Sequence, residues 1–362
     1  MVFDLSDTLM DYIPGSQQET EVIRCVTNIL TGYFEGNLLV TCSRKFICFF
    51  MNKIKAPDAL LALNYLDRIS SMLVYEVIYR ISVVRKESDL SDGELSYKFF
   101  QKTESIQPTS LICEDIYDCN FYELYTKEFM QDINVKCNRV EGGGSSVGKC
   151  IKEAKAKNAI FLSLVDSDCH YKGASIGSTA QGAINELPKN TTNIFLKILD
   201  TLEAENLIPI GYVIKHCKNQ KNEKFFRQLF TNNFGFIWRY YDLKNGLCSS
   251  AIIEDEKYYQ SGKEWYQKLL HKEDFETRVR NYKQAKEDKL PKIMGKNNVL
   301  LPKICKNILN QYITYLSSKE SERAYIAYDK DFDKMDPLYK ERKEIVDLVY
   351  AFLCVRKQEP IN

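Results

Sequence analysis

The sequence predicts an α/β protein in which a small parallel sheet, flanked by helices, lies between two mainly helical regions. Between residues 108 and 215, short apolar segments alternate with amphipathic ones, which is the pattern of a parallel sheet and its crossover helices. Residues 1–107 and 216–362 instead space most of their apolar residues for one buried helical face. At roughly 100–200 residues per domain, a chain of 362 residues is expected to hold two or three units.

The amino-terminal region, residues 1–107, is predicted to be mainly helical. The segment ALLALNYLDRISSMLVYEVIYRI (59–81) has helical periodicity, whereas LLVTC (38–42) and FICFFM (46–51) are also compatible with strands. A polar stretch at 85–96 is followed by the turn-forming sequence TESIQPTS (103–110), which indicates a boundary near residue 107.

The central region, residues 108–215, is predicted to form the sheet. Its expected strands are SLICE (110–114), DINVKCNRVE (132–141) and AIFLSLVD (159–166), separated by helices over YDCNFYELYTKEFM (117–130) and VGKCIKEAKAKN (147–158). A polar loop to about residue 190, a further helix over IFLKILDTLEAEN (194–206) and the apolar segment LIPIGYVI (207–214) follow. Ligands of open α/β sheets bind at the carboxyl ends of the strands, so the site is expected there.

The carboxy-terminal region, residues 216–362, is rich in Lys, Tyr and Phe and is predicted to be largely helical, ending in an amphipathic helix over 339–357. Basic residues outnumber acidic ones in residues 271–296, where Phe275 and Tyr282 are interleaved. This stretch is a candidate nucleic-acid surface, and a solvated charged helix face explains it equally well. Trp238, Tyr240 and Tyr241 are expected to pack in the core.

Carboxylates follow two of the predicted strands. Glu114 ends the first of them, and Asp166 and Asp168 end the third, with Asp118 one helical turn beyond Glu114. Crowded carboxylates raise one another's pKa unless a cation neutralises them, and Mg²⁺ (or Mn²⁺) prefers oxygen ligands. The sequence therefore predicts a divalent-metal site at this edge of the sheet.

The segments CEDIYDCNFYE (113–123), VEGGGSS (140–146) and DSD (166–168) together resemble the topoisomerase–primase, or Toprim, domain over roughly residues 108–215, about a third of the chain. Asp115 stands where that family usually has glycine. The segments AENLIP (204–209) and YYDLKNGL (240–247) resemble short motifs that follow the Toprim core in nucleases of bacterial anti-phage defence systems, related to old-type nucleases.

The resemblance implies a metal-dependent nuclease that acts on DNA or RNA, with Glu114, Asp166 and Asp168 as catalytic acids. Asp118 and Glu205 are the further metal ligands that it implies. For the substrate, Lys215 or Lys244 is expected to offset transition-state charge, and amides at Gly143, Gly144 and Ser145 are candidate phosphate contacts. A defence effector must be restrained in healthy cells, so the resemblance also implies a regulatory partner, such as an ATPase sensor, or a homo-oligomer.

Two other functions remain open. The sequence GGSSVGKC (143–150) fits the GxxxxGK pattern of a P-loop NTPase, with Cys150 in place of the Ser or Thr that holds Mg²⁺, and this function would depend on Lys149. The acids could instead serve a non-catalytic binding or scaffold protein. His170, two residues beyond Asp168, is a candidate proton shuttle or metal ligand, and a solvated loop histidine is the more ordinary interpretation.

Amino-acid composition limits the classes of protein to which the chain can belong. Fifty Lys and Arg against forty-nine Asp and Glu leave a formal charge of +1, so nucleic-acid contact must come from local patches. Twelve cysteines without a CxxC pair indicate reduced thiols and a cytoplasmic protein, and three histidines are too few for a Cys/His zinc cluster. The first residues, MVFDLSDTLMDY, are acidic, and we expect neither a signal peptide nor a membrane span.

Overall fold

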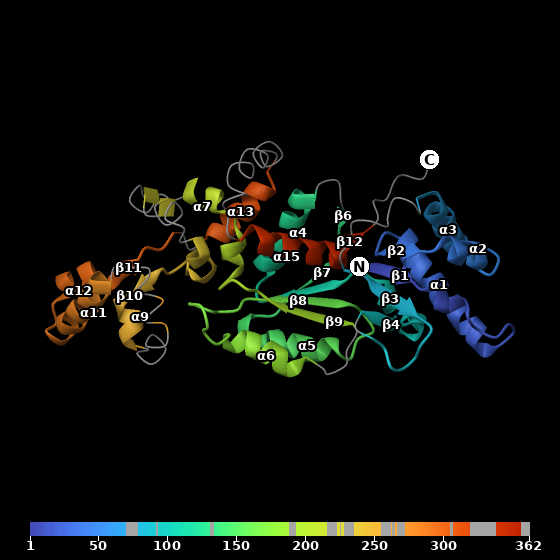
Figure 1. Ribbon diagram of the computed structural model, residues 1–362, viewed down its shortest axis with the longest axis horizontal. Coiled ribbons are helices and arrows are strands. Elements are labelled where there is room, and N and C mark those ends of the chain that lie inside the picture. Colours follow the sequence, from blue (N-terminus) through green and yellow to red (C-terminus); the bar gives the residue numbers. More distant parts are fainter. Residues whose placement is uncertain are drawn as a thin grey trace. The chain divides into compact units, whose positions relative to one another are not determined.

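The computed structural model describes residues 1–69, 79–91, 93–130, 134–187, 193–215, 223–224, 226–227, 235–254, 262, 265, 272–304, 307–318 and 338–355 (Figure 1). The chain divides into two compact units. The first unit comprises Met1–Val165, Gly182–Lys197 and Lys343–Asn362, and the second comprises Asp166–Gln181 and Ile198–Arg342. The domain limits at residues 107 and 215 stay predictions.

The first unit begins with a four-stranded parallel sheet of order β2-β1-β3-β4. Its strands are β1 (Val2–Leu5), β2 (Leu39–Cys42), β3 (Ile81–Val84) and β4 (Glu94–Ser96). The prediction of a mainly helical region missed this sheet, because strands of three or four residues are too short to display an alternating pattern. Of the two segments left open, LLVTC is a strand and FICFFM is helical.

Three helices accompany this sheet, namely α1 (Gln17–Phe34), α2 (Arg44–Met51) and α3 (Pro57–Ile69). The first two begin at serine caps: Ser16 accepts a hydrogen bond from the Glu19 amide, and Ser43 accepts one from the Phe46 amide. Short 3-10 helices cover Asp7–Met10, Tyr97–Gln101 and Thr103–Ile106.

A second four-stranded parallel sheet has the order β7-β5-β8-β9, which confirms the predicted α/β class with a parallel sheet flanked by helices. Its strands are β5 (Ser110–Cys113), β7 (Asn138–Glu141), β8 (Phe161–Val165) and β9 (Ile194–Ile198). Strands β5 and β8 are central neighbours, in register from Ser110 opposite Phe161, and all their residues are buried. Near-continuous apolar runs are typical of such central parallel strands.

Helices pack on both faces of the second sheet. Figure 1 shows α4 (Ile116–Met130) on one face and α5 (Val147–Ala154) on the other. α5 buries Val147, Ile151 and Ala154, a spacing that places all three on one helical face. α15 (Tyr339–Leu353) is the amphipathic helix that was predicted over 339–357. Its Phe352 packs against Phe195 of β9, with the two ring centroids 4.6 Å apart. α6 (Ser178–Glu186) lies in the predicted polar loop, and β6 (Asn134–Val135) pairs antiparallel with β12 (Cys354–Val355).

The assignments after residue 193 need correction. The expected helix over 194–206 is strand β9 followed by a 3-10 helix (Ala204–Leu207), and the apolar segment after it contains the helix α7 (Ile210–Lys215). Short apolar runs of five to eight residues fit a strand and a buried helix equally well, so periodicity alone could not separate them.

The second unit also contains the 3-10 helix Gly235–Tyr240 and the elements β10 (Leu247–Cys248), α9 (Ser249–Glu254), α11 (Lys272–Glu287), α12 (Pro291–Asn298), β11 (Val299–Leu301) and α13 (Ile308–Leu316). Trp238 and Tyr241 are buried, as predicted for core residues. Phe275 and Tyr282, the aromatic residues of the candidate nucleic-acid surface, are only 5% and 7% exposed, so their rings are not available to stack on bases. Within the described ranges, no helix combines the length and apolarity needed to cross a membrane.

Candidate functional site

Glu114 lies in the first unit, directly after the central strand β5. Two aspartates then cap α4: the Asp115 carboxylate accepts the Tyr117 amide at 2.9 Å, and the Asp118 carboxylate accepts the Asp115 amide at 3.0 Å. Reciprocal capping of this kind satisfies amides that have no partner within the helix. Asp115 therefore replaces the usual glycine with a cap, and Asp118, a predicted metal ligand, has a structural role at the start of α4.

The glycine turn after β7 closes over the end of β5. The Gly142 amide donates to the Cys113 carbonyl at 2.8 Å, and the Gly144 amide donates to the Glu114 carbonyl at 3.3 Å. A Cβ atom on Gly142 would clash with Val147 and with the Cys113 carbonyl, so glycine is required there. The turn thus fixes the backbone at Glu114.

One of the three amides predicted to contact a phosphate is occupied by this backbone packing. The Gly144 amide is engaged with the protein's own backbone, whereas Gly143 is exposed at the tip with a φ of +60°. The side chain of Ser145 lies outside the described residues. In the P-loop interpretation, Lys149 would reach phosphates from the same turn. It lies inside α5, and its Nζ is 3.9 Å from the Glu153 carboxylate of that helix.

In the second unit, hydrogen bonds fix the DSD segment that follows β8. The Ser167 hydroxyl donates to the Thr201 carbonyl at 2.6 Å, and the Asp168 amide donates to the Leu202 carbonyl at 3.0 Å. Asp168 has a left-handed φ of 55°, and its carboxylate lies where a side chain on Gly177 would otherwise be. The segment after β8 is therefore held against the segment after β9.

Three acids and a lysine meet in the second unit, and we call them the acid–lysine cluster: Asp166, Glu203, Glu205 and Lys244. The Lys244 Nζ lies 2.8 Å from Glu205 Oε1 and 3.4 Å from Glu203 Oε2. Asp166 Oδ1 accepts the amide of Ala204, the residue between the two glutamates, at 3.0 Å. The Glu205 side chain is only 6% exposed, so one lysine faces carboxylates that are largely removed from water.

Hydrogen bonds of Asn206 connect the backbone segments that carry this cluster. Its amide nitrogen donates to the carbonyls of Trp238 and Tyr241 at 2.7 and 2.8 Å, and its amide oxygen accepts the Glu203 N–H at 3.0 Å. The Trp238 indole N–H donates back to the Asn206 carbonyl at 3.2 Å. Asn206 is completely buried, and a fully satisfied buried amide of this kind rigidifies the segments that it joins.

Burial and charge shape the acid–base properties of the cluster. Burial raises the pKa of Glu203 to about 7, the Glu205 charge adds to this effect, and Lys244 opposes it. Burial alone would lower the pKa of Lys244, but the carboxylates of Glu205 and Glu203 outweigh it and raise that pKa above its ordinary value. Lys244 is therefore held as an ammonium ion among carboxylates that repel one another.

Lys244 is aimed by a tight turn over residues 242–246. The Asp242 carboxylate accepts the amides of Lys244 and Asn245 at 3.0 and 2.7 Å, and the Gly246 amide donates to the Asp242 carbonyl at 2.8 Å. Gly246 has a φ of +69°. His170 is partly buried rather than fully solvated; burial lowers its pKa, while the charges of Asp242 and Asp168 act in the opposite direction.

The donor chemistry of the cluster fits a hard cation such as Mg²⁺, because every candidate ligand is a carboxylate oxygen. Glu203 Oε2 is buried and already faces the Lys244 ammonium at 3.4 Å, although among the described residues it accepts no hydrogen bond. Across the part of the chain that the structure describes, no three His, Cys, Asp or Glu side chains are grouped so as to hold a metal ion. A cation would compete with Lys244 for Glu205 and with the Ala204 amide for Asp166.

The predicted residues thus fall into separate groups. The structure brings together Asp166, Glu205 and Lys244, while the Asp168 carboxylate turns to Gly177. Glu114, Asp118 and the glycine turn belong to the first unit. The Lys215 side chain lies outside the described residues, although its backbone ends α7.

Sequence reasoning missed Glu203. The signal was present, because Glu203 and Glu205 flank one alanine in the same way that Asp166 and Asp168 flank one serine. In the expected helix, residues two apart point to different sides. Glu203 is instead extended, with φ −142° and ψ 165°, which lets both carboxylates reach Lys244.

Comparison of the chain with known protein families, with curated proteins and with solved structures gave no match.

Proposed function

We propose that this protein is a divalent-metal-dependent nuclease that hydrolyses phosphodiester bonds of DNA or RNA. The observation that carries the proposal is the acid–lysine cluster, in which Asp166, the residue directly after the central parallel strand β8, lies with Glu203, Glu205 and Lys244. Ligands of open α/β sheets bind at that end of the strands. The resemblance of residues 108–215 to the Toprim domain supports the same reaction and suggests a role as effector in anti-phage defence.

In this proposal, Asp166, Asp168 and Glu205 of the second unit supply oxygens that hold Mg²⁺ or Mn²⁺. Glu114 and Asp118 are further metal ligands on the resemblance alone. The bound ion would neutralise charge on the scissile phosphate and activate the attacking water. Lys244, an ammonium ion kept charged by its neighbours, would stabilise the extra negative charge of the transition state. Asp242 and the turn it organises hold the Lys244 backbone in place, so that little reorganisation is needed during reaction.

The proposal is tested by incubating supercoiled plasmid and single-stranded RNA with the purified protein and Mg²⁺ or Mn²⁺. We expect metal-dependent cleavage by the parent and a loss of about 100-fold in Asp166→Asn and Glu114→Gln, the scale found when one transition-state contact is removed. Asp58→Asn is the matched control, because Asp58 is an exposed acid in the first turn of α3, away from every residue assigned to the site or to the candidate nucleic-acid surface, and this variant should cleave normally. Equal residual cleavage by all four proteins would assign the activity to a contaminant.

A non-catalytic binding protein is the second candidate, and the pairing of Lys244 with both glutamates favours it. Such pairing already offsets carboxylate charge without a metal. This candidate predicts binding of nucleic acid or a partner with no cleavage under any metal condition. In both cases we propose, from the resemblance alone, that a regulatory partner such as an ATPase sensor, or self-association, restrains the protein.

A further inference from the structure

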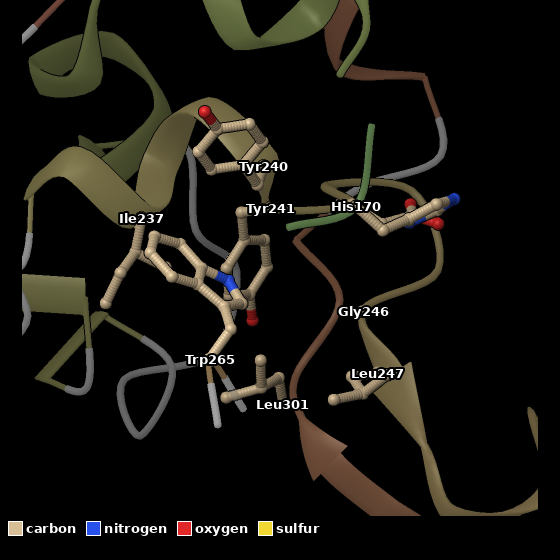
Figure 2. Close-up of a pocket in the computed structure, with 9 residues that line it drawn as sticks. His170, Ile237, Tyr240, Tyr241, Gly246, Leu247, Trp265 and Leu301 are labelled. Carbon is tan, nitrogen blue, oxygen red and sulfur yellow. The ribbon is translucent and has the colours of Figure 1, made fainter. Parts of the chain in front are cut away.

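A small cavity of the second unit lies among the side chains of His170, Tyr240, Tyr241 and Trp265 (Figure 2). Its volume of about 20 Å³ is the space of about one water molecule. The Tyr240 and Trp265 rings meet edge to face, with centroids 5.3 Å apart and planes at 90°, and Tyr241 is buried. The cavity is therefore a gap in the packed core and not a ligand site.

The strand β7 of the first unit lies at an edge of the second sheet, and one of its sides is open. Among the described strands, β7 pairs only with β5. The Asn138 amide donates to the Thr109 carbonyl on the β5 side at 3.0 Å. Because the hydrogen-bonding groups of successive residues point to opposite sides of a strand, those of Arg139 and Glu141 point away from β5.

The outward backbone groups of β7 are almost unused. Among the described residues, the N–H and C=O of Arg139 and the N–H of Glu141 make no hydrogen bond, and the Glu141 carbonyl accepts only the Cys150 thiol, at 3.9 Å. Arg139 and Glu141 are both exposed. A row of unpaired backbone groups on an edge strand is a template for a strand of another chain.

The charges of β7 make this edge complementary to itself. Arg139 and Glu141 are two residues apart, so their opposite charges lie on the same face of the strand. If two copies of β7 pair antiparallel about Val140, Arg139 of each copy lies directly opposite Glu141 of the other, and the outward backbone groups of these residues face one another. A parallel pairing in register would instead place like charges side by side.

The Arg139 side chain is already held in position for this pairing. Its Nε and Nη2 donate to Glu123 Oε2 of α4 at 3.1 and 2.6 Å. The side chain nevertheless remains 42% exposed, and a guanidinium has five N–H donors, of which Glu123 takes two. A second carboxylate can therefore bind the same guanidinium with little further ordering of the arginine.

We propose that two copies of this chain join through β7, in an antiparallel pair centred on Val140 that continues the second sheet from one copy into the other. The interface is isologous, as in most two-fold dimers, and uses strand addition. It gives a surface to the self-association proposed above and does not depend on the nuclease function. Because β7 is only four residues long, the dimer is weak and reversible.

The test is sedimentation velocity of the full chain with EDTA present, from micromolar to millimolar concentration. We expect a reversible dimer in the parent. Glu141→Arg places an arginine opposite each Arg139 and should weaken dimerisation about 10-fold or more. Glu141→Pro removes an outward N–H while sparing the bonds to β5, as proline on an edge strand can, and should also weaken it. Glu104→Arg, the same charge change at an exposed glutamate of the first unit, is the control.

A charge exchange tests the register of the pair. Arg139→Glu alone should be monomeric, whereas an equimolar mixture of Arg139→Glu and Glu141→Arg should dimerise, because each changed residue then faces an opposite charge. Circular dichroism verifies that each variant is folded, since Arg139→Glu also loses the pair with Glu123.

A parent that stays monomeric throughout, or a dimer unchanged in folded Glu141→Arg and Glu141→Pro, would overturn the inference. Dimerisation through β7 by a protein that never cleaves would overturn the nuclease function alone. Cleavage by a parent that stays monomeric would overturn the dimer alone.

Discussion

Replacing Lys244 with methionine removes the cation of the acid–lysine cluster while keeping most of the length of an unbranched side chain. At an effective dielectric constant of about 20, the contacts at 2.8 and 3.4 Å correspond to gross attractions of about 6 and 5 kcal/mol. Desolvation of the lysine offsets much of this, and removal of one partner from a buried pair typically costs about 3–5 kcal/mol. Because the Lys244 side chain is 33% exposed, we expect a loss near 3 kcal/mol.

Both tryptophans of the chain, Trp238 and Trp265, lie in the second unit, so denaturant unfolding followed by tryptophan fluorescence reports on the unit that contains Lys244. The matched control is Lys149→Met in the first unit. The Lys149 side chain is 76% exposed and its ion pair spans 3.9 Å, so this variant should stay within about 0.5 kcal/mol of the parent. Its unfolding is followed by circular dichroism.

The same variant separates the two functions proposed for the cluster. If the carboxylates bind a divalent cation, Mg²⁺ or Mn²⁺ should restore part of the stability of Lys244→Met, because the ion replaces the missing charge. A second change, Glu205→Gln, should relieve the uncompensated charge and partly rescue stability. A Lys244→Met protein as stable as the parent would refute the electrostatic reasoning.

Two further predictions concern the stability of each unit. Gly246 has a φ of +69°, and in Gly246→Ala the new Cβ would overlap a backbone oxygen of β11. We therefore expect the free energy of unfolding to fall by about 2 kcal/mol or more in the fluorescence assay. Gly295→Ala, in open space within α12, is the control and should be neutral or stabilising by about 0.5–1 kcal/mol. Glu123→Gln should cost about 1–3 kcal/mol, because the Glu123 carboxylate accepts hydrogen bonds from Lys127 and Arg139 at 2.6 Å. Burial would raise the pKa of Glu123, but these two partners outweigh it and lower the pKa, so the stabilisation is present above the ordinary pKa of 4.5 and is lost as the pH falls through the folded-state value. Unfolding of the parent and Glu123→Gln, followed by circular dichroism against pH, should show the two stabilities converging in acid, and a constant difference would contradict this pH dependence.

The second sheet could be predicted from the sequence because each of its central strands, β5 and β8, has a clear residue pattern. The runs SLIC and FLSLV are apolar apart from one serine each and are followed at once by charged residues, which marks buried parallel strands with clear ends. Edge strand β9 could not be recognised in this way, because IFLKI is short, contains a lysine and is followed by residues with helical spacing. The strands of the first sheet were missed for the same reason of length.

Two of the three acids of the candidate site could be named from the sequence, whereas Glu203 and the partners of these acids could not. Asp166 was named from the DSD motif and Glu205 from the resemblance of AENLIP to a family motif. Their contacts with the Ala204 amide and with Lys244 depend on how the segments after β8 and β9 and the turn over residues 242–246 pack together. Asn206, which joins two of those segments, gave no signal as a structural residue. Long-range packing of this kind is not encoded in local spacing.

The central claim is that these carboxylates hold a divalent cation, and calorimetric titration of Mn²⁺ into the metal-free protein tests it most directly. We expect saturable binding to the parent and strongly weakened binding to Asp166→Asn and Glu205→Gln, with Asp58→Asn unaffected. No saturable Mn²⁺ binding by the parent, or equal binding by all four proteins, would contradict the claim.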